Sequence, residues 1–149
     1  VRGKLSAKAI GIDPNQVVLG DVGFLADWLG VDYEGGGGSF WVPHYADRRM
    51  FKAAVYVDLL DQPLAVLDQL RHADEVVTSS LHAMIIADMW GIPHMVKLSS
   101  AVIGGRHKFD DYLSAFGETF VADQWRLTPR NKMRKTQARL TRLLADWQP

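Results

Sequence analysis

Four polar side chains separate two apolar runs in "VVTSSLHAMIIADMW", residues 76–90. They are Thr78, Ser79, Ser80 and His82, and they stand where a predicted strand ends and a predicted helix begins. The start of a helix presents free backbone amides and the positive end of its dipole, and nearby hydroxyls add donors. An imidazole in the first turn can give a proton to a bound anion. The segment therefore predicts an anion site with His82 as proton donor.

A purely structural interpretation of the same residues stays open. Ser79 or Ser80 can act as the N-cap of a helix that runs to Trp90, and Gly91 then ends it. In that case His82 is incidental. Spacing alone does not separate the two interpretations.

Short apolar runs alternate with helical patterns, which is typical of βαβ units and a parallel sheet. The strands are predicted at residues 16–21, 39–44, 53–59, 75–79 and 94–99. The helices are predicted at residues 4–11, 22–30, 63–73, 81–90 and 129–147. The expected fold is α/β, a single Rossmann-like domain over residues 1–149 with a parallel sheet flanked by helices. In such sheets ligands bind beyond the carboxyl ends of the strands, where residues 78–82 would lie.

The amino-acid composition excludes several classes of protein and of site. Seventeen basic residues balance seventeen acidic ones, so no net charge recruits nucleic acid or an anionic membrane. The absence of cysteine excludes disulfides and thiolate chemistry and fits a reducing compartment. Five histidines lack the close spacing of a zinc site, and no apolar run is long enough to span a bilayer. We expect a cytoplasmic protein that needs no metal, and a chain starting at Val1 is consistent with a piece of a longer one.

Two segments stand out by composition. Residues 129–147 predict a basic amphipathic helix, and a solvated surface face is favoured over a nucleic-acid site because no aromatic residues interleave the cations. Residues 34–39, "EGGGGS", predict either a flexible surface loop or a mobile flap. They lack GxGxxG spacing, so a dinucleotide fingerprint is rejected. The cations in and just before residues 129–147 are Arg126, Arg130, Lys132, Arg134, Lys135, Arg139 and Arg142.

Five segments, in order, resemble the polysaccharide pyruvyl transferase family. "VVTSSLHAMIIADMWGIPH" is similar to the family's strand, Ser-Ser or Ser-Arg pair, Leu-His-Gly, apolar helix and Gly-Ile-Pro stop. The others are "VRGKLSAKAIG", "VVLGDVGFLAD", "WVPHYAD" and "KFDDYLSAFG". Together they cover nearly the whole chain, though only the C-terminal part of a typical member. Five matches in the right order are more specific than any one of them.

The chain departs from the family pattern at four positions. Lys4 and Val22 stand where the family commonly has Pro, and Ala83 stands where Gly is usual. Ser80 stands where some members carry Arg. Ala83 adds a methyl group beside the proposed anion site, and the missing Arg removes one bidentate clamp.

The resemblance implies one lobe of a two-lobed enzyme of the GT-B type. Such an enzyme transfers the pyruvyl unit of phosphoenolpyruvate to two hydroxyls of a glycan or lipid-linked sugar as a ketal and releases phosphate. Phosphoenolpyruvate is a substrate, so no cofactor is expected. This chain would be the donor-binding lobe, and self-association is possible.

The resemblance also assigns roles to residues. His82 would protonate the enol methylene, and Arg2 would pair with the carboxylate or phosphate of the donor. Ser79, Ser80 and the amide of Leu81 would complete the anion cradle. An alternative for Arg2 is a surface residue at a frayed terminus.

Further residues are expected to bind substrate at the same site. His44 and Tyr45 end a predicted strand and could line the cleft, although a lone histidine there is as often structural. Asp21 also ends a predicted strand and could equally cap the next helix. Lys108 and Tyr112 complete the predicted set.

The adjacent carboxylates Asp110 and Asp111 do not face each other on a helix, so they predict capping of a helix that runs toward Phe116. The preceding loop, residues 104–108, is a candidate lid.

Two alternative functions remain open from sequence. A free-standing Rossmann-like binding or scaffold module fits the size, because one lobe lacks the wall that orients an acceptor. A lobe of a nucleotide-sugar glycosyltransferase is the other, because a shared fold does not determine chemistry.

Overall fold

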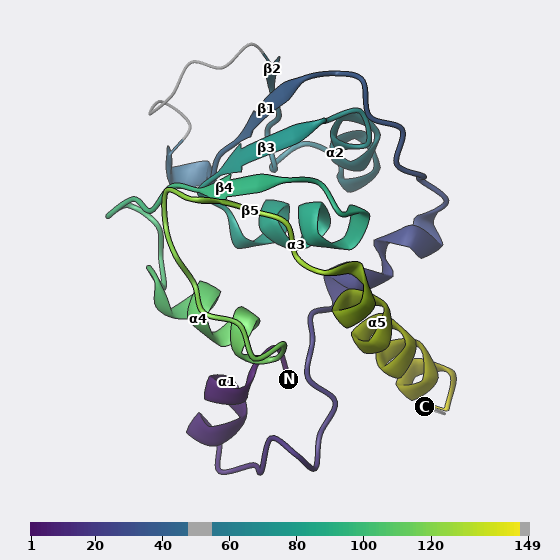
Figure 1. Ribbon diagram of the computed structural model, residues 1–149, viewed down its shortest axis with the longest axis vertical. Helices are drawn as coiled ribbons and strands as arrows, with labels where there is room; N and C mark the ends of the chain where they lie inside the picture. Colours follow the sequence, from purple (N-terminus) through teal and green to yellow (C-terminus); the bar gives the residue numbers. More distant parts are fainter. Residues whose placement is uncertain (48–54, 147–149) are drawn as a thin grey trace.

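A mixed sheet of five strands, flanked by helices, forms the centre of the molecule (Figure 1). The computed structural model describes residues 1–47 and 55–146. The strands are β1 (Ser39–Val42), β2 (Val55–Tyr56), β3 (Glu75–Thr78), β4 (His94–Val96) and β5 (Trp125–Arg126), and their order is β2-β1-β3-β4-β5. The first four are parallel, and β5 runs antiparallel to β4. The predicted α/β, Rossmann-like class is confirmed.

The helices follow the predicted order along the chain. They are α1 (Lys4–Ala9), α2 (Pro63–Leu70), α3 (Leu81–Trp90), α4 (His107–Ser114) and α5 (Arg130–Ala145), with 3-10 helices η1 (Val22–Leu29) and η2 (Tyr45–Asp47). Pro63 starts α2 at a position where a missing amide costs nothing. Gly91 ends α3 with a left-handed φ of 71°, which glycine adopts without strain.

Residues 16–21, predicted as a strand, are not one. The segment instead contacts the N-terminus, since the amide of Gly20 donates to the carbonyl of Val1 (3.0 Å) and the amino group of Val1 donates to the carbonyl of Val18 (3.3 Å). Gly20 has a φ of 145°, and Asp21 turns the chain into η1. The short strand β5 was not predicted, because two residues are too few to show alternation. The first two residues of the predicted strand 53–59 lie outside the described residues.

The glycine loop 34–39 lies away from the carboxyl edge of the sheet. It leads into the amino end of β1, and the amides of Gly36 and Gly38 donate to the carboxylate of Asp74 (2.7 and 2.8 Å). These hydrogen bonds to the charged form lower the pKa of Asp74. These hydrogen bonds hold the loop in place at the amino end of β1. The interpretation as a mobile flap over a ligand at the carboxyl edge does not fit this position.

The side chains of α3 take part in two hydrophobic clusters, which explains why this helix is apolar on nearly every face. One cluster joins α3 to the sheet and α2 through residues such as Leu70 and Val76. The other joins α3 to η1, α4 and α5 through residues such as Phe24, Phe109 and Met133.

The amphipathic helix predicted at 129–147 is present as α5. Met133 and Leu140 are buried against the core, whereas Leu143 and Leu144 are exposed. Residue 147 lies outside the described range. None of the helices within the described part of the chain is long and apolar enough to cross a membrane.

A buried polar network fastens α4 to α3 and β4. The Tyr112 hydroxyl donates to Asp88 Oδ2 (2.8 Å), and His94 Nε2 lies 3.6 Å from Asp88 Oδ1. All three side chains are fully enclosed. Burial and the charge of Asp88 raise the pKa of Tyr112, so the phenol remains a donor.

We expect Tyr112→Phe to lower the free energy of unfolding by about 1–3 kcal/mol, because Asp88 loses a partner in a site that water does not reach. Denaturant unfolding measures the loss. Tyr33→Phe is the matched control, since the Tyr33 hydroxyl makes no hydrogen bond with the described residues, and it should change stability by less than about 0.5 kcal/mol. Equal effects of the two substitutions would contradict this role of the network.

Candidate functional site

The carboxyl ends of β1 and β3 are joined by side-chain hydrogen bonds. The buried Thr78 hydroxyl donates to the carbonyl of Val42 (2.5 Å) and accepts from the amide of Ser80 (2.8 Å). Ser79 Oγ accepts from the amide of His44 (2.9 Å). Thr78 and Ser79 are thus occupied in bringing the segment after β1 against the start of α3.

The first turn of α3 has open amides. Ser80 occupies the N-cap position in an extended conformation, but its side chain makes no capping hydrogen bond, so the predicted capping role of its hydroxyl is wrong. The amides of Leu81, His82 and Ala83 donate to no atom of the described residues. These three donors lie at the positive end of the helix, where Leu81 and Ala83 are buried and His82 is exposed.

Arg2 is held in place by the carboxylate of Asp21. Its Nε donates to Asp21 Oδ2 at 2.8 Å, and Asp21 Oδ1 accepts from the amide of Gly23 (2.9 Å). Asp21 therefore both orients Arg2 and caps η1. The frayed-terminus interpretation of Arg2 does not apply, because the side chain is held by a carboxylate that is itself fixed.

The N-terminal segment is also anchored on α4, as Figure 1 shows for the adjacent helices α1 and α4. The amide and hydroxyl of Ser6 donate to the buried carboxylate of Asp111 (2.8 and 2.5 Å). A Cβ on Gly3 would lie 1.8 Å from the carbonyl oxygen of Asp111, so no larger residue fits there. The prediction that Asp110 and Asp111 cap α4 is wrong: Asp111 holds α1, and Asp110 pairs with Arg106.

Four basic side chains act on one another through their charges, those of Arg2, His44, His82 and Lys108. Burial lowers the pKa of Lys108, and the positive charge of Arg2 lowers it further. Burial also lowers the pKa of His44, and the charges of Lys108 and His82 act in the same direction. These side chains come from the N-terminus, α4, the end of β1 and α3, so the fold alone assembles them.

The orientation of His44 is defined by its neighbours. The amide of Ala46 donates to His44 Nδ1 (3.3 Å), which in the neutral ring leaves the proton on Nε2. The ring lies 4.3 Å from that of the exposed Tyr45, centroid to centroid. His44 therefore offers one N–H donor, and its lowered pKa keeps the ring neutral near pH 7.

His82 is exposed and stands between two different environments. On one side lies the group of cations and free amides. On the other is a cavity of about 300 Å³ with almost wholly apolar walls from η1, α2 and α3, including Ala26, Val66 and Ile86. A ligand at His82 can thus place an anionic end and an apolar end on different surfaces.

Two residues of this region, Asp47 and Ser99, were not predicted to belong to the site. Asp47 is buried, and its Oδ1 accepts from Ser99 Oγ at 2.6 Å, while Oδ2 has no hydrogen-bond partner among the described residues. The charge of Asp47 raises the pKa of both His44 and Lys108 and so offsets part of the cationic repulsion. Asp47 follows the Pro-His-Tyr segment directly, which is the signal that could have identified it.

The structure gathers most of the predicted site residues at one edge of the sheet. Tyr112 is not among them, because its side chain is enclosed in the core and its hydroxyl is bonded to Asp88. The loop proposed as a lid is partly helical, since His107 and Lys108 form the first turn of α4. Within the described residues no group of three metal-ligand side chains occurs. The residues of the predicted set that lie in this region are Arg2, Asp21, His44, Tyr45, Ser79, Ser80, Leu81, His82 and Lys108, of which Ser79, Ser80 and Leu81 are buried.

We expect Lys108→Gln to raise the pKa of the His44 imidazole, because a positive charge that disfavours protonation is removed. An NMR titration of the His44 ring measures the shift. Asp47→Asn should lower the same pKa, since a stabilising negative charge is lost. Lys135→Gln on α5 is the control and should leave His44 unchanged. A pKa of His44 that is the same in the wild type and Lys108→Gln would contradict the proposed proximity.

Comparison with known proteins identifies the family of this chain. A model of the polysaccharide pyruvyl transferase family matches residues 1–98, which include Arg2, Asp21, His44 and His82. Uncharacterized protein L143 of Acanthamoeba polyphaga mimivirus is 31% identical over an alignment of 140 residues, which covers 78% of this chain and 47% of that protein. The chain thus spans about half the length of that curated relative. No solved structure matches this chain. This chain belongs to the polysaccharide pyruvyl transferase family.

Proposed function

We propose that this chain is the donor-binding lobe of an enzyme that transfers the pyruvyl unit of phosphoenolpyruvate to two hydroxyls of a glycan or lipid-linked sugar. The observation that carries the proposal is a chain of close charges, in which Arg2 acts on Lys108, and Lys108 and the exposed His82 both act on His44, beside first-turn amides of α3 that have no acceptor among the described residues. The donor, the acceptor and the role as one lobe are all parts of this proposal.

The charges of the site suit the two anionic groups of phosphoenolpyruvate. Arg2 uses Nε to bond Asp21, and its two terminal nitrogens make no hydrogen bond with the described residues. They can receive a carboxylate or phosphate in a charge-assisted, bidentate contact. Lys108 adds a second cation, and the amides of residues 81–83 add neutral donors.

In the proposed reaction His82 acts as the acid. Its imidazolium gives a proton to the methylene carbon of the enol, and the central carbon becomes electrophilic. The first sugar hydroxyl bonds to that carbon and returns its proton to the imidazole. The bond to the phosphate oxygen breaks, the second hydroxyl bonds to the same carbon, and its proton leaves with the phosphate. A positioned acid of this kind contributes about 10²–10⁴ in rate.

The apolar cavity on the other side of His82 supports this assignment. The methylene group is the one apolar part of the donor, and the cavity offers it a surface without competing hydrogen-bond donors. The acceptor side requires a second wall that orients two hydroxyls. We assign that wall to a second lobe of the GT-B type or to a second copy of the chain.

We expect Arg2→Gln to weaken phosphoenolpyruvate binding at least tenfold, because a charge-assisted hydrogen bond worth about 1.5–3 kcal/mol is lost. His82→Gln should bind the donor within a few-fold of the wild type and lower pyruvyl transfer by about 10²–10⁴. Calorimetry measures binding, and phosphate release in the presence of acceptor measures transfer. Arg139→Gln on α5 removes the same charge elsewhere and should change neither.

Stability gives an independent check. A donor concentration of 100 times the dissociation constant should add about 2.7 kcal/mol to the free energy of unfolding of the wild type. No shift at millimolar phosphoenolpyruvate would overturn the proposal in favour of a non-catalytic module. A shift with a nucleotide sugar alone would identify a glycosyltransferase lobe instead.

A further inference from the structure

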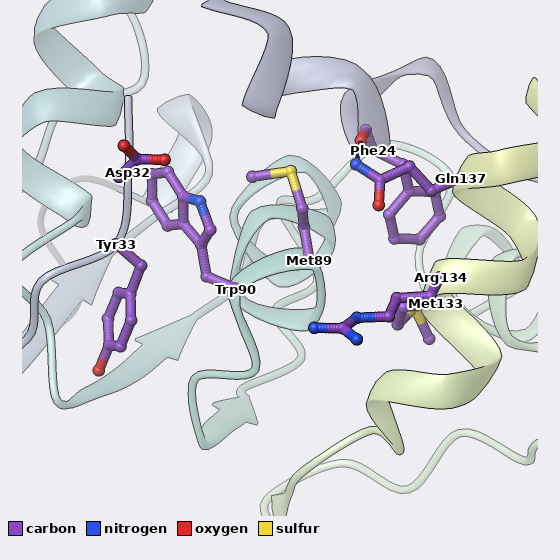
Figure 2. A pocket seen from close by; sticks show the side chains of 8 residues that line it. All are labelled: Phe24, Asp32, Tyr33, Met89, Trp90, Met133, Arg134 and Gln137. Atoms are coloured by element: carbon purple, nitrogen blue, oxygen red, sulfur yellow. Dashed lines mark hydrogen bonds between the residues drawn. The ribbon is translucent and has the colours of Figure 1, made fainter. Parts of the chain in front are cut away.

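A second cavity lies at the opposite end of α3 from His82 (Figure 2). Its volume is about 310 Å³, within the range of small-molecule sites, and its walls come from η1, the loop after it, the last turn of α3, and α5. Eight residues separate His82 from Trp90, or about 12 Å along the helix axis. None of the residues around this cavity belongs to the site described above.

Two charged side chains, Arg134 and Asp32, line the cavity. Figure 2 shows Arg134 extending from α5 toward Trp90 and Met89, with Asp32 on the far side of Trp90. Neither charged side chain makes an ion pair or hydrogen bond with the described residues. Lys132, on the same helix, is by contrast paired with Glu118. The cavity therefore presents a guanidinium donor and a carboxylate acceptor that no other described side chain engages.

Between these charges lies an apolar surface. The rings of Tyr33 and Trp90 stack with centroids 6.3 Å apart and planes at 30°. Trp90 is only 6% exposed, so the half-buried Tyr33 and Met89 supply most of the accessible apolar area. Gln137 Nε2 donates to the carbonyl of Phe24 (3.0 Å), which fastens α5 to η1 and fixes the wall that carries Arg134.

We propose that this cavity binds a saccharide that carries one carboxylate. The planar guanidinium of Arg134 matches a carboxylate bidentately. The carboxylate of Asp32 accepts from ring hydroxyls, and the C–H face of the sugar packs on Tyr33 and Met89. A ligand with several phosphates is disfavoured, because one cation faces it and Asp32 repels it.

The inference deepens the proposed function and rests on it for the identity of the natural ligand. A pyruvyl ketal keeps the carboxylate of its donor, so the product of the proposed reaction is a saccharide of this class. The cavity is then a product-binding or modified-glycan site on the same lobe. A uronic acid has the same chemistry and is another member of the class.

Binding of methyl 4,6-O-(1-carboxyethylidene)-galactoside to the full chain tests the inference. We expect the acid to shift the NMR signals of the Met89 and Met133 methyl groups, and its methyl ester to bind at least tenfold more weakly. Arg134→Gln should weaken binding of the acid by about ten- to hundredfold, since one charge-assisted contact is lost. Lys135→Gln, the next cation on α5, should leave the affinity unchanged.

Equal affinity of the acid for wild type and Arg134→Gln, or equal affinity of acid and ester, would overturn the assignment. Shifts confined to residues near His82 would overturn it as well. The two proposals fail separately, because His82→Gln should not alter saccharide binding here and Arg134→Gln should not alter phosphoenolpyruvate binding. If the chain does not bind phosphoenolpyruvate but still binds the saccharide, and this binding depends on Arg134, the proposed pyruvyl transfer is overturned and the saccharide site stands.

Discussion

The hydroxyl of Thr78 is the contact on which the candidate site depends. It is fully buried at the end of β3, where it donates to Val42 of β1 and accepts from the amide of Ser80. The first bond holds the two strand ends together, and the second sets the extended backbone from which α3 starts. Valine has a similar shape but would leave both backbone groups without a partner in the core. The positions of His44 and His82 both follow from this arrangement.

The site concentrates like charges that the fold has to hold together. Arg2, His44 and Lys108 come from remote parts of the chain, and burial together with mutual repulsion lowers the pKa of His44 and Lys108. The negative charge of the buried Asp47 carboxylate offsets part of this repulsion. Neighbouring groups with shifted pKa values are typical of functional sites. A dianionic ligand would relieve the repulsion, so the same charges that cost stability favour binding.

The two ends of helix α3 carry the two proposed sites and give them different chemistry. Its first turn presents amides and the positive end of the dipole, which suit anions. Its last turn, which carries Met89 and Trp90, presents apolar surface beside one guanidinium and one carboxylate. Because the middle of the helix is buried in both hydrophobic clusters, the two ends are held rigidly with respect to each other.

Local patterns in the sequence determined the α/β class, most of the strands and helices, and the placement of His82 in the first turn after a buried strand. Such patterns depend on neighbours in the chain, which periodicity and capping residues record. Only the tertiary structure decided that Tyr112 is enclosed with Asp88, that residues 16–21 pair with the N-terminus, and that Asp47 lies beneath His44 and Lys108. Burial and electrostatic proximity arise from contacts between segments up to a hundred residues apart, such as Ser6 with Asp111, and no local pattern encodes them.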